Sequence, residues 1–204
     1  MVVDEEVGGR LSSLQVFGAE LLITEREDPL LWGCYPMAPW AGRVRDGRFT
    51  SDGREYQLPL RMPPHAIHGT VLDRAWLWTA EDTLSTSLGK SWPFDGEAVQ
   101  RIRLEPDRLT LDLSVHSAAE RFPATIGWHP WFRRRLARGG REAELGFTAR
   151  SMFIRDEQGL PTGEKMQPSS SPWDDCFGDV VSQPVLEWPG FLRLKLASST
   201  NYWV

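Results

Sequence analysis

The sequence predicts an all-β protein built as a large antiparallel β-sandwich. Short apolar runs separated by turn signals recur along the whole chain, as expected for a sandwich or barrel. Residues 109–116 alternate strictly between apolar and polar side chains, and this period of two indicates a half-buried strand. No window longer than about a dozen residues shows a helical period. We expect residues 1–204 to form a single domain.

The N-terminal residues predict a hairpin. Residues 10–16 and 19–24 are apolar-rich runs, and Phe17-Gly18 lies between them. Glycine takes the positive φ of a tight turn at little steric cost. Residues 25–40 contain several prolines, which cannot donate to a sheet ladder. We therefore expect a loop or an edge strand over that stretch rather than a central strand.

Two further hairpins have clearer signals. Asp52-Gly53 separates two short runs and is a strong signal for a two-residue turn. Residues 101–104 and 109–115 alternate on either side of Pro106-Asp107, which predicts an antiparallel pair with one solvated face. His116 falls on the polar face of this pair, so we expect it to be solvated.

The C-terminal third predicts more strands and one long loop. We expect strands over residues 143–147 and 151–155, around a short break. Residues 158–172 are rich in Gly, Pro and Ser, which is typical of a loop. A last hairpin is expected over residues 185–197, with Pro189-Gly190 at its turn.

Composition limits the classes of function. The chain has 23 basic and 28 acidic residues and a net charge of −5, so it lacks the basic character of nucleic-acid proteins. No apolar run approaches roughly 18 residues, the length of a membrane span. Cys34 and Cys176 form no C-x-x-C pair, which favours a reduced, cytoplasmic protein. We expect no nucleic-acid or membrane partner, and the sequence leaves the oligomeric state open.

Residues 127–132 (Gly-Trp-His-Pro-Trp-Phe) are the most informative stretch for function. They place His129, a side chain that exchanges protons near neutral pH, among aromatic rings. Aromatic faces can line a cleft and pack against the apolar face of a sugar. The alternative is a tryptophan-rich piece of core in which His129 is only hydrogen-bonded.

Other polar residues have competing interpretations. His65 and His68 could serve a metal if helical, but the adjacent prolines and glycine argue against a helix, so we expect no metal site. His68 alone is interpreted as a loop histidine bonded to the backbone. The pair Asp174-Asp175 suggests acid–base chemistry, a cation site or a surface turn, and its spacing favours the turn. The three arginines at 133–135 are expected to form a solvated surface.

Several catalytic motifs are absent, namely the G-x-S-x-G nucleophile elbow, the phosphate-binding G-x-x-x-x-G-K-[ST] loop and the dinucleotide-binding G-x-G-x-x-G turn. The candidate site residues that remain are Arg43, His68, His129 and Asp174. Arginine offers a forked donor, histidine a tunable proton and aspartate a hydrogen-bond acceptor. This combination suits a neutral, polyhydroxylated ligand.

Four motifs in order resemble a known family: residues 40–44 (Trp-Ala-Gly-Arg-Val), 65–69 (His-Ala-Ile-His-Gly), 127–132 and 174–177 (Asp-Asp-Cys-Phe). Together they resemble the aldose 1-epimerase (galactose mutarotase) family over nearly the whole chain. Residues 8–11 (Gly-Gly-Arg-Leu) look like the opening hairpin of that family. The resemblance implies an antiparallel β-sandwich that interconverts the α and β anomers of free aldoses, such as galactose and glucose, without a cofactor.

The resemblance also implies a role for each candidate residue. Arg43 and His68 would bind sugar hydroxyls, and Asp174 would accept hydrogen bonds from the ligand. His129 would be the general acid at the ring oxygen. The family's base is a glutamate in a Val-Glu-Pro-Gln-like segment that should follow residues 201–204, so we give that role to no residue here. We therefore expect a fragment, or a shortened member, of a mutarotase-like protein.

Two other functions stay open. A sugar-binding sandwich without catalytic activity would keep the ligand-contacting residues and lack the base. A hexose-6-phosphate epimerase of the same fold could use Arg43, Arg45 and residues 133–135 to bind a phosphate. Residues 40–43, however, look more like the neutral-sugar branch, and inhibition by phosphate would separate the two.

Overall fold

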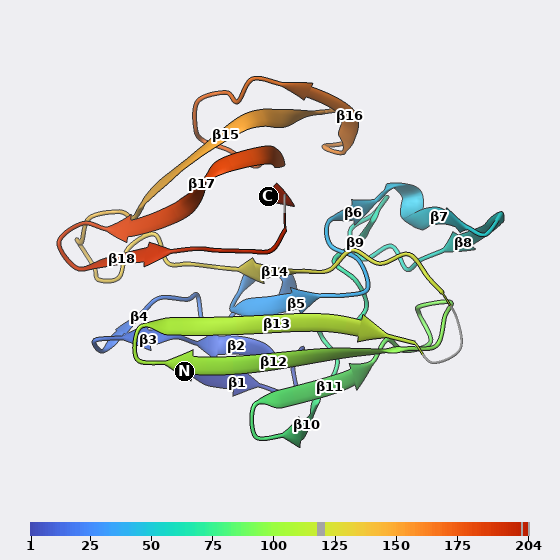
Figure 1. The fold of residues 1–204 in the computed structure, drawn as a ribbon, viewed down its shortest axis with the longest axis horizontal. Coiled ribbons are helices and arrows are strands. Elements are labelled where there is room, and N and C mark those ends of the chain that lie inside the picture. Colours follow the sequence, from blue (N-terminus) through green and yellow to red (C-terminus); the bar gives the residue numbers. More distant parts are fainter. Residues whose placement is uncertain (118–120, 201, 204) are drawn as a thin grey trace. The chain divides into compact units, whose positions relative to one another are not determined.

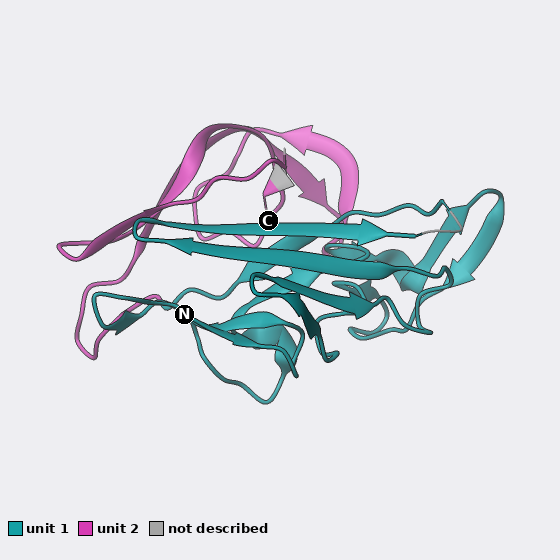
Figure 2. Cartoon of the chain, turned by 60° about the horizontal axis from the view of Figure 1, so that its bottom comes forward, with its two compact units in different colours: residues 1–133 teal, residues 134–204 magenta. Residues whose placement is uncertain are grey.

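The computed structural model describes residues 1–117, 121–200 and 202–203. Apart from two short 3₁₀ turns, each helix or strand assigned over these residues is a β-strand, and all the named strand pairs are antiparallel (Figure 1). The predicted all-β class is therefore confirmed. The chain divides into two compact units, residues 1–133 and 134–204 (Figure 2). The expected single domain over residues 1–204 stays a prediction.

The first unit contains two four-stranded sheets. The strand order of one is β1 (Val2–Asp4), β2 (Arg10–Ser13), β5 (Cys34–Met37) and β14 (Gly127–Pro130). The order of the other is β10 (Leu77–Ala80), β11 (Thr83–Ser87), β12 (Glu97–Glu105) and β13 (Arg108–His116). The smaller elements are β3 (Gln15–Val16) paired with β4 (Ala19–Glu20), η1 (Pro29–Leu31), β6 (Arg43–Val44) paired with β9 (Ala66–Ile67), η2 (Arg45–Gly47), and β7 (Arg48–Ser51) paired with β8 (Arg54–Gln57).

The core of the first unit lies between these two sheets. Leu11 and Cys34 from the first sheet belong to the same buried cluster as Leu84, Ala98 and Ile102 from the second. Burying a side chain of leucine size contributes roughly 1.5–3 kcal/mol, so a cluster shared by both sheets holds them face to face. The first unit is therefore a β-sandwich by itself.

Two predicted hairpins are confirmed in detail. β12 and β13 pair from Glu97 opposite His116 to Glu105 opposite Arg108, with the predicted turn between them. Asp52 and Gly53 have φ of 48° and 75°, the left-handed conformation that a tight two-residue hairpin turn needs at both positions. The N-terminal hairpin turn at Phe17-Gly18 also forms, although the strands beside it, β3 and β4, are shorter than predicted.

The prediction for residues 25–40 was wrong in part, because β5 is an inner strand between β2 and β14, while the other residues of this stretch form no named strand. Pro36 lies opposite Trp128, and Pro130 lies opposite Cys34. In an antiparallel ladder only every second residue donates its N–H toward a given neighbour. Both prolines occupy the same phase of this alternation, so the ladder between β5 and β14 loses no donor. Prolines at that spacing do not exclude an inner strand.

The second unit is one sheet with the strand order β16 (Pro161–Met166), β15 (Glu144–Arg155), β17 (Phe177–Trp188) and β18 (Leu192–Lys195), with β19 (Tyr202–Trp203) also on β17. The predicted last hairpin forms between β17 and β18. The two strands predicted over 143–147 and 151–155 are instead one strand, whose pairing is irregular at 146–149. The prediction of a loop over residues 158–172 was wrong in part, because β16 lies within this stretch. The residues of β16 are all exposed and show no apolar alternation.

The guanidinium of Arg10 is buried in the first unit and joins three segments of the chain. It donates to the carbonyl oxygens of Val7 (2.8 Å), Pro29 (2.7 Å), Trp32 (2.9 Å) and Leu72 (2.7 Å). It also lies over the Trp32 ring, 4.2 Å from the ring centroid. Burial lowers the pKa of Arg10 to about 10, so the group is still charged at neutral pH. Charge-assisted bonds to carbonyl groups offset the cost of desolvating this charge.

We predict that Gly69→Ala destabilises the first unit far more than Gly53→Ala. Both glycines have positive φ, 81° and 75°, so alanine costs about 1 kcal/mol at either position for conformation alone. A β-carbon at position 69 would also overlap the Ala38 carbonyl, which accepts the Thr70 N–H at 2.8 Å. A β-carbon at position 53 would meet no atom within 4 Å apart from its chain neighbours.

The measurement is urea unfolding followed by tryptophan fluorescence. We expect a loss of about 3–5 kcal/mol for Gly69→Ala, against about 1 kcal/mol for Gly53→Ala. Equal losses would show that the close approach of residues 38 and 69 does not contribute.

Candidate functional site

The first unit brings together three of the four predicted site residues. The rings of His68 and His129 lie with their centroids 5.1 Å apart and their planes at 71°. Arg43 lies in β6 opposite Ile67, the residue before His68, and its charge acts on the His68 ring. His68 lies in the loop after β9, and His129 lies in β14. The fold thus places two imidazoles that are distant in the sequence side by side.

His68 is held by a reciprocal pair of hydrogen bonds with Gly42. The His68 N–H donates to the Gly42 carbonyl, and the Gly42 N–H donates to Nδ1 of His68, each at 3.1 Å. Because Nδ1 accepts, the neutral ring carries its proton on Nε2. His68 has a φ of 56°, a left-handed conformation that is uncommon outside glycine. The predicted backbone-bonded loop histidine is confirmed, and this ring is also next to His129.

The surroundings of His68 keep it neutral. Burial, together with the charges of His129 and Arg43, lowers the pKa of His68 from its ordinary value of 6.5 to about 3. Burial disfavours the cation because an ion loses hydration, and nearby positive charge adds repulsion. At neutral pH His68 therefore offers one polar group to a ligand, the Nε2–H donor.

His129 is half-buried and stacks on two aromatic rings. In the pairing of β14 with β5 it lies opposite Tyr35, and the two rings stack at 4.9 Å and 13°. The Trp131 ring also stacks on His129, at 5.4 Å and 23°. Residues 129 and 131 share one side of an extended chain, which explains the contact. The stretch 127–132 thus contributes both a core-facing stack and a partly exposed imidazole.

Arg43 is exposed, and its guanidinium lies 3.8 Å from the sulfur of Met62. Its strand β6 pairs only with β9 among the described residues, with Val44 opposite Ala66. The backbone that carries Arg43 directly follows Gly42, the partner of His68. The backbones of Arg43 and His68 are therefore held close together by the hydrogen bonds between Gly42 and His68.

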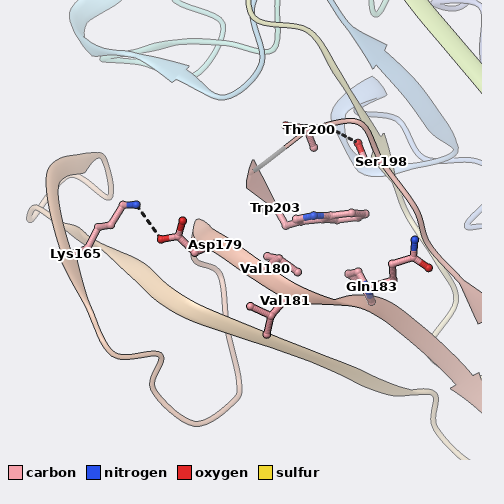
Figure 3. A pocket seen from close by; sticks show the side chains of 9 residues that line it. Lys165, Asp179, Val180, Val181, Gln183, Ser198, Thr200 and Trp203 are labelled. Atoms are coloured by element: carbon pink, nitrogen blue, oxygen red, sulfur yellow. Dashed lines mark hydrogen bonds and ion pairs between the residues drawn. The ribbon is translucent and has the colours of Figure 1, made fainter.

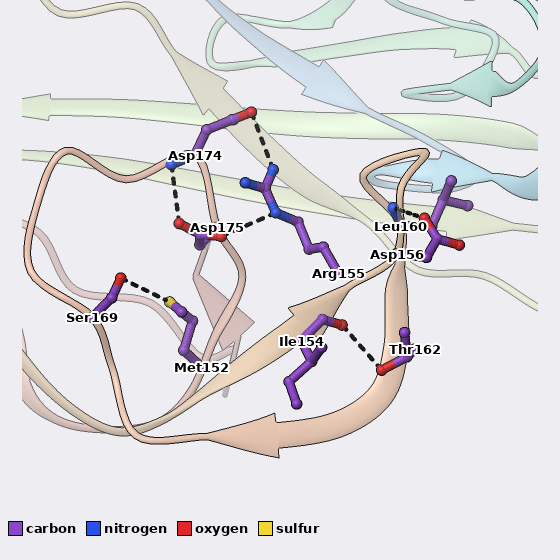
Figure 4. Close-up of polar contacts among 9 residues, drawn as sticks. All are labelled: Met152, Ile154, Arg155, Asp156, Leu160, Thr162, Ser169, Asp174 and Asp175. Carbon is purple, nitrogen blue, oxygen red and sulfur yellow. Dashed lines mark hydrogen bonds and ion pairs between the residues drawn. The ribbon is translucent and has the colours of Figure 1, made fainter.

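Asp174 lies in the second unit, on the segment before β17 (Figure 4). Its exposed carboxylate pairs with Arg155 at 3.3 Å, and the same guanidinium pairs with the less exposed Asp175 at 3.0 Å. Exposed ion pairs of this kind contribute little to stability. The carboxylate therefore stays available as an acceptor. Its exposure agrees with the predicted surface position, but no turn is assigned at residues 173–176.

The second unit also has a pocket of about 420 Å³ beside β17, which the sequence did not indicate (Figure 3). β18 and β19 pair with opposite ends of β17, and the pocket lies along the edge between them. The indole of Trp203 lies on one side of the pocket, and Lys165 pairs with Asp179 at 3.2 Å. A hydrogen bond from Ser151 and the Lys165 charge hold the pKa of Asp179 below its usual value.

Other expectations concern charge and metals. Arg134 and Arg135 are exposed and both pair with Glu142, while Arg133 donates to the Leu22 carbonyl at 2.7 Å. The predicted solvated surface thus holds for the last two arginines. Over the residues that the structure describes, no three His, Cys, Asp or Glu side chains are placed to hold a metal ion. No described helix is long and apolar enough to cross a membrane.

Sequence reasoning missed residues that contact His129 and His68. Tyr35 lies in a proline-containing stretch that was predicted to be irregular, so it was not placed in a strand opposite His129. Gly42 was quoted only as part of a motif, and nothing local indicated its pairing with His68. Such contacts depend on strand register, which becomes visible only in the assembled sheet.

The chain matches the family model described as aldose 1-epimerase over residues 3–185. The uncharacterized protein YphB of Escherichia coli is 35% identical over 105 residues, which is 48% of this chain and 36% of YphB. The galactose mutarotase of Rattus norvegicus is 27% identical over 137 residues, which is 60% of this chain and 39% of that protein. The chain therefore spans less than half the length of these two curated relatives.

Among solved structures, a galactose mutarotase-like protein from Clostridium acetobutylicum has a TM-score of 0.83 with this chain. The match covers 98% of this chain and 75% of that one, at 18% sequence identity. A likeness at this identity concerns the fold, and it confirms the predicted mutarotase-like β-sandwich.

We predict that His68→Asn reduces the acid sensitivity of the fold. The His68 ring binds a proton near pH 6.5 when the chain is unfolded, but only near pH 3 when it is folded. Between these values the unfolded chain holds more protons, so the free energy of unfolding falls as the pH drops from about 6.5 toward 3. Asparagine accepts the Gly42 N–H and tolerates positive φ, but it does not become charged.

The measurement is urea unfolding of both proteins between about pH 4 and pH 8. The two curves of stability against pH are expected to run parallel above about pH 7, where the histidine is neutral in both states. Below that, the wild type is expected to lose stability faster. Parallel curves over the whole range would rule out a neutral, buried His68.

Proposed function

Because the chain belongs to the aldose 1-epimerase family, we propose that it interconverts the α and β anomers of a free aldose, such as galactose or glucose. The proposed chemistry is acid–base ring opening with His129 as the acid. The observation that carries the proposal is the pair of imidazoles of His68 and His129, 5.1 Å apart in different surroundings.

The different surroundings divide the work between the two rings. His68 is suited to binding, because its low pKa leaves a neutral ring that donates from Nε2 to a sugar hydroxyl. Two imidazolium ions at this distance would repel each other, so with His68 neutral the proposed acid is His129. The rings of Tyr35 and Trp131 that stack on His129 offer aromatic faces, which attract a cation. Environments that separate two like groups in this way are typical of acid–base sites.

In the proposed reaction His129 gives its proton to the ring oxygen while a base removes the proton of the anomeric hydroxyl. The bond between C1 and the ring oxygen breaks, and C1 becomes an aldehyde. After rotation about the C1–C2 bond, the two proton transfers reverse, and the ring closes to the other anomer. No proton is gained or lost overall. A positioned acid and base contribute roughly 10²–10⁴-fold each.

We propose Arg43 and Asp174 as further groups that bind sugar hydroxyls. Arg43 is exposed near His68 and offers a planar fork of donors, while the exposed Asp174 carboxylate is an acceptor. We assign the base to no residue. This leaves a second candidate function, sugar binding without turnover. Binding without turnover is favoured by the hydrogen-bond donors that lie near His68 in the first unit. The positive charges that act on the His68 ring belong to His129 and Arg43.

We predict that this chain speeds the approach of freshly dissolved α-D-galactose or α-D-glucose to anomeric equilibrium, as measured by polarimetry. His129→Ala removes the proton donor and is expected to slow this step by about 10²–10⁴-fold. His116→Ala is the matched control, because His116 is an exposed histidine on β13 whose partner is Ser114. The control is expected to keep the wild-type rate.

Two other results would change the assignment. Saturable binding of galactose by a folded chain that leaves the rate unchanged would replace turnover by binding alone. Competitive inhibition by inorganic phosphate, together with loss of inhibition in Arg43→Ala, would favour a hexose 6-phosphate as substrate.

A further inference from the structure

The carbonyl group of Leu30 is the common partner of the two rings that stack on His129. The Tyr35 hydroxyl donates to it at 3.2 Å, and the Trp131 indole N–H donates to it at 2.8 Å. A carbonyl oxygen has two lone pairs, so it can accept both bonds at once. One backbone atom therefore helps to set the positions of both rings that stack on His129.

The position of this carbonyl is itself fixed. Leu30 belongs to the 3₁₀ turn η1, and its N–H donates to the side chain of Asp28 at 2.9 Å. The carbonyl of Pro29, one residue before Leu30, and that of Trp32, two residues after it, both accept from the buried guanidinium of Arg10. The peptide of Leu30 is thus held from both directions, and it has little freedom to follow a movement of the rings.

The two donors keep their protons under all ordinary conditions. Burial raises the pKa of Tyr35 above its usual value, so its hydroxyl stays a donor at any working pH. An indole N–H is a donor only. The two contacts with Leu30 therefore do not change with pH.

We propose that Tyr35 and Trp131 are positioning residues for His129, and that the Leu30 carbonyl fixes them in register. Stacking against two rings that are themselves held in place limits the tilt of the imidazole, and so restricts the direction in which His129 presents its N–H. This inference rests on the proposed function, in which His129 protonates the sugar ring oxygen. Small errors in such an alignment are costly, since a displacement of about 1 Å can cost 10²-fold in rate.

The test uses Tyr35→Phe and Trp131→Phe, which each remove one donor to Leu30 and keep an aromatic ring. We expect kcat for anomer interconversion to fall about tenfold in each, with KM within about a factor of two, because sugar binding by other groups is unchanged. The matched controls are Tyr56→Phe and Trp78→Phe, at a tyrosine on β8 that stacks on Phe49 and at a partly exposed tryptophan on β10. Both are expected to behave as the wild type.

A second readout does not require activity. In the wild type His129 stacks on two aromatic rings, so the NMR signals of its ring protons should be shifted upfield by ring currents. Both test variants are expected to move these signals toward the values of an unstacked histidine. His129→Ala identifies them, and the chemical-shift dispersion of other signals shows that the variants are folded.

The two readouts separate the possible failures. Folded variants with unchanged kcat would overturn the positioning role, and so would unchanged His129 signals. A wild-type chain that shows no turnover would remove the proposed function instead. The His129 signals alone would then decide, and a shift in both variants would still support the role of Leu30 in holding the rings that stack on His129.

Discussion

The first unit depends on one buried charge, the guanidinium of Arg10. It is fully buried and is bonded to carbonyl groups of Val7, Pro29, Trp32 and Leu72. Burying a charge is costly unless it is fully hydrogen-bonded, so this arrangement is stable only when all three segments are in place at once. The guanidinium thereby couples the first sheet to the turn η1 and to the segment that follows His68. The geometry around the two imidazoles is a consequence of this coupling, because both segments contribute to it.

The two strongest local patterns in the sequence correspond to the most regular parts of the fold. The alternation that ends at His116 became the long β12–β13 pair, and Asp52-Gly53 became a tight turn. Both signals are local, since side-chain period and turn conformation are decided by near neighbours. Pro36 misled because a ladder uses only every second N–H, and this depends on the partner strand. The edge strand β16 was missed because its residues are all exposed, so its sequence shows no alternation between apolar and polar side chains.

The candidate site shows the same division between local and non-local information. His68 and His129 could be selected from the sequence by chemistry and by their resemblance to a family. Their separation, their ring angles and the low pKa of His68 could not, because these follow from strand register and burial. Tyr35 and the Leu30 carbonyl were invisible for a further reason. A backbone oxygen leaves no trace in residue identity, and a tyrosine beside a proline is unremarkable until a strand is formed around it.

The paired hydrogen bonds between Gly42 and His68 have a consequence for the kind of ligand that this corner can accept. Since Nδ1 is occupied by the backbone, the imidazole can only donate, and the neighbouring arginine can only donate as well. A hydroxyl oxygen has lone pairs for such donors. An ammonium group has none, and its charge would be repelled by Arg43. In the proposed site, the backbone conformation at Gly42 and His68 would therefore disfavour a sugar that carries an ammonium group.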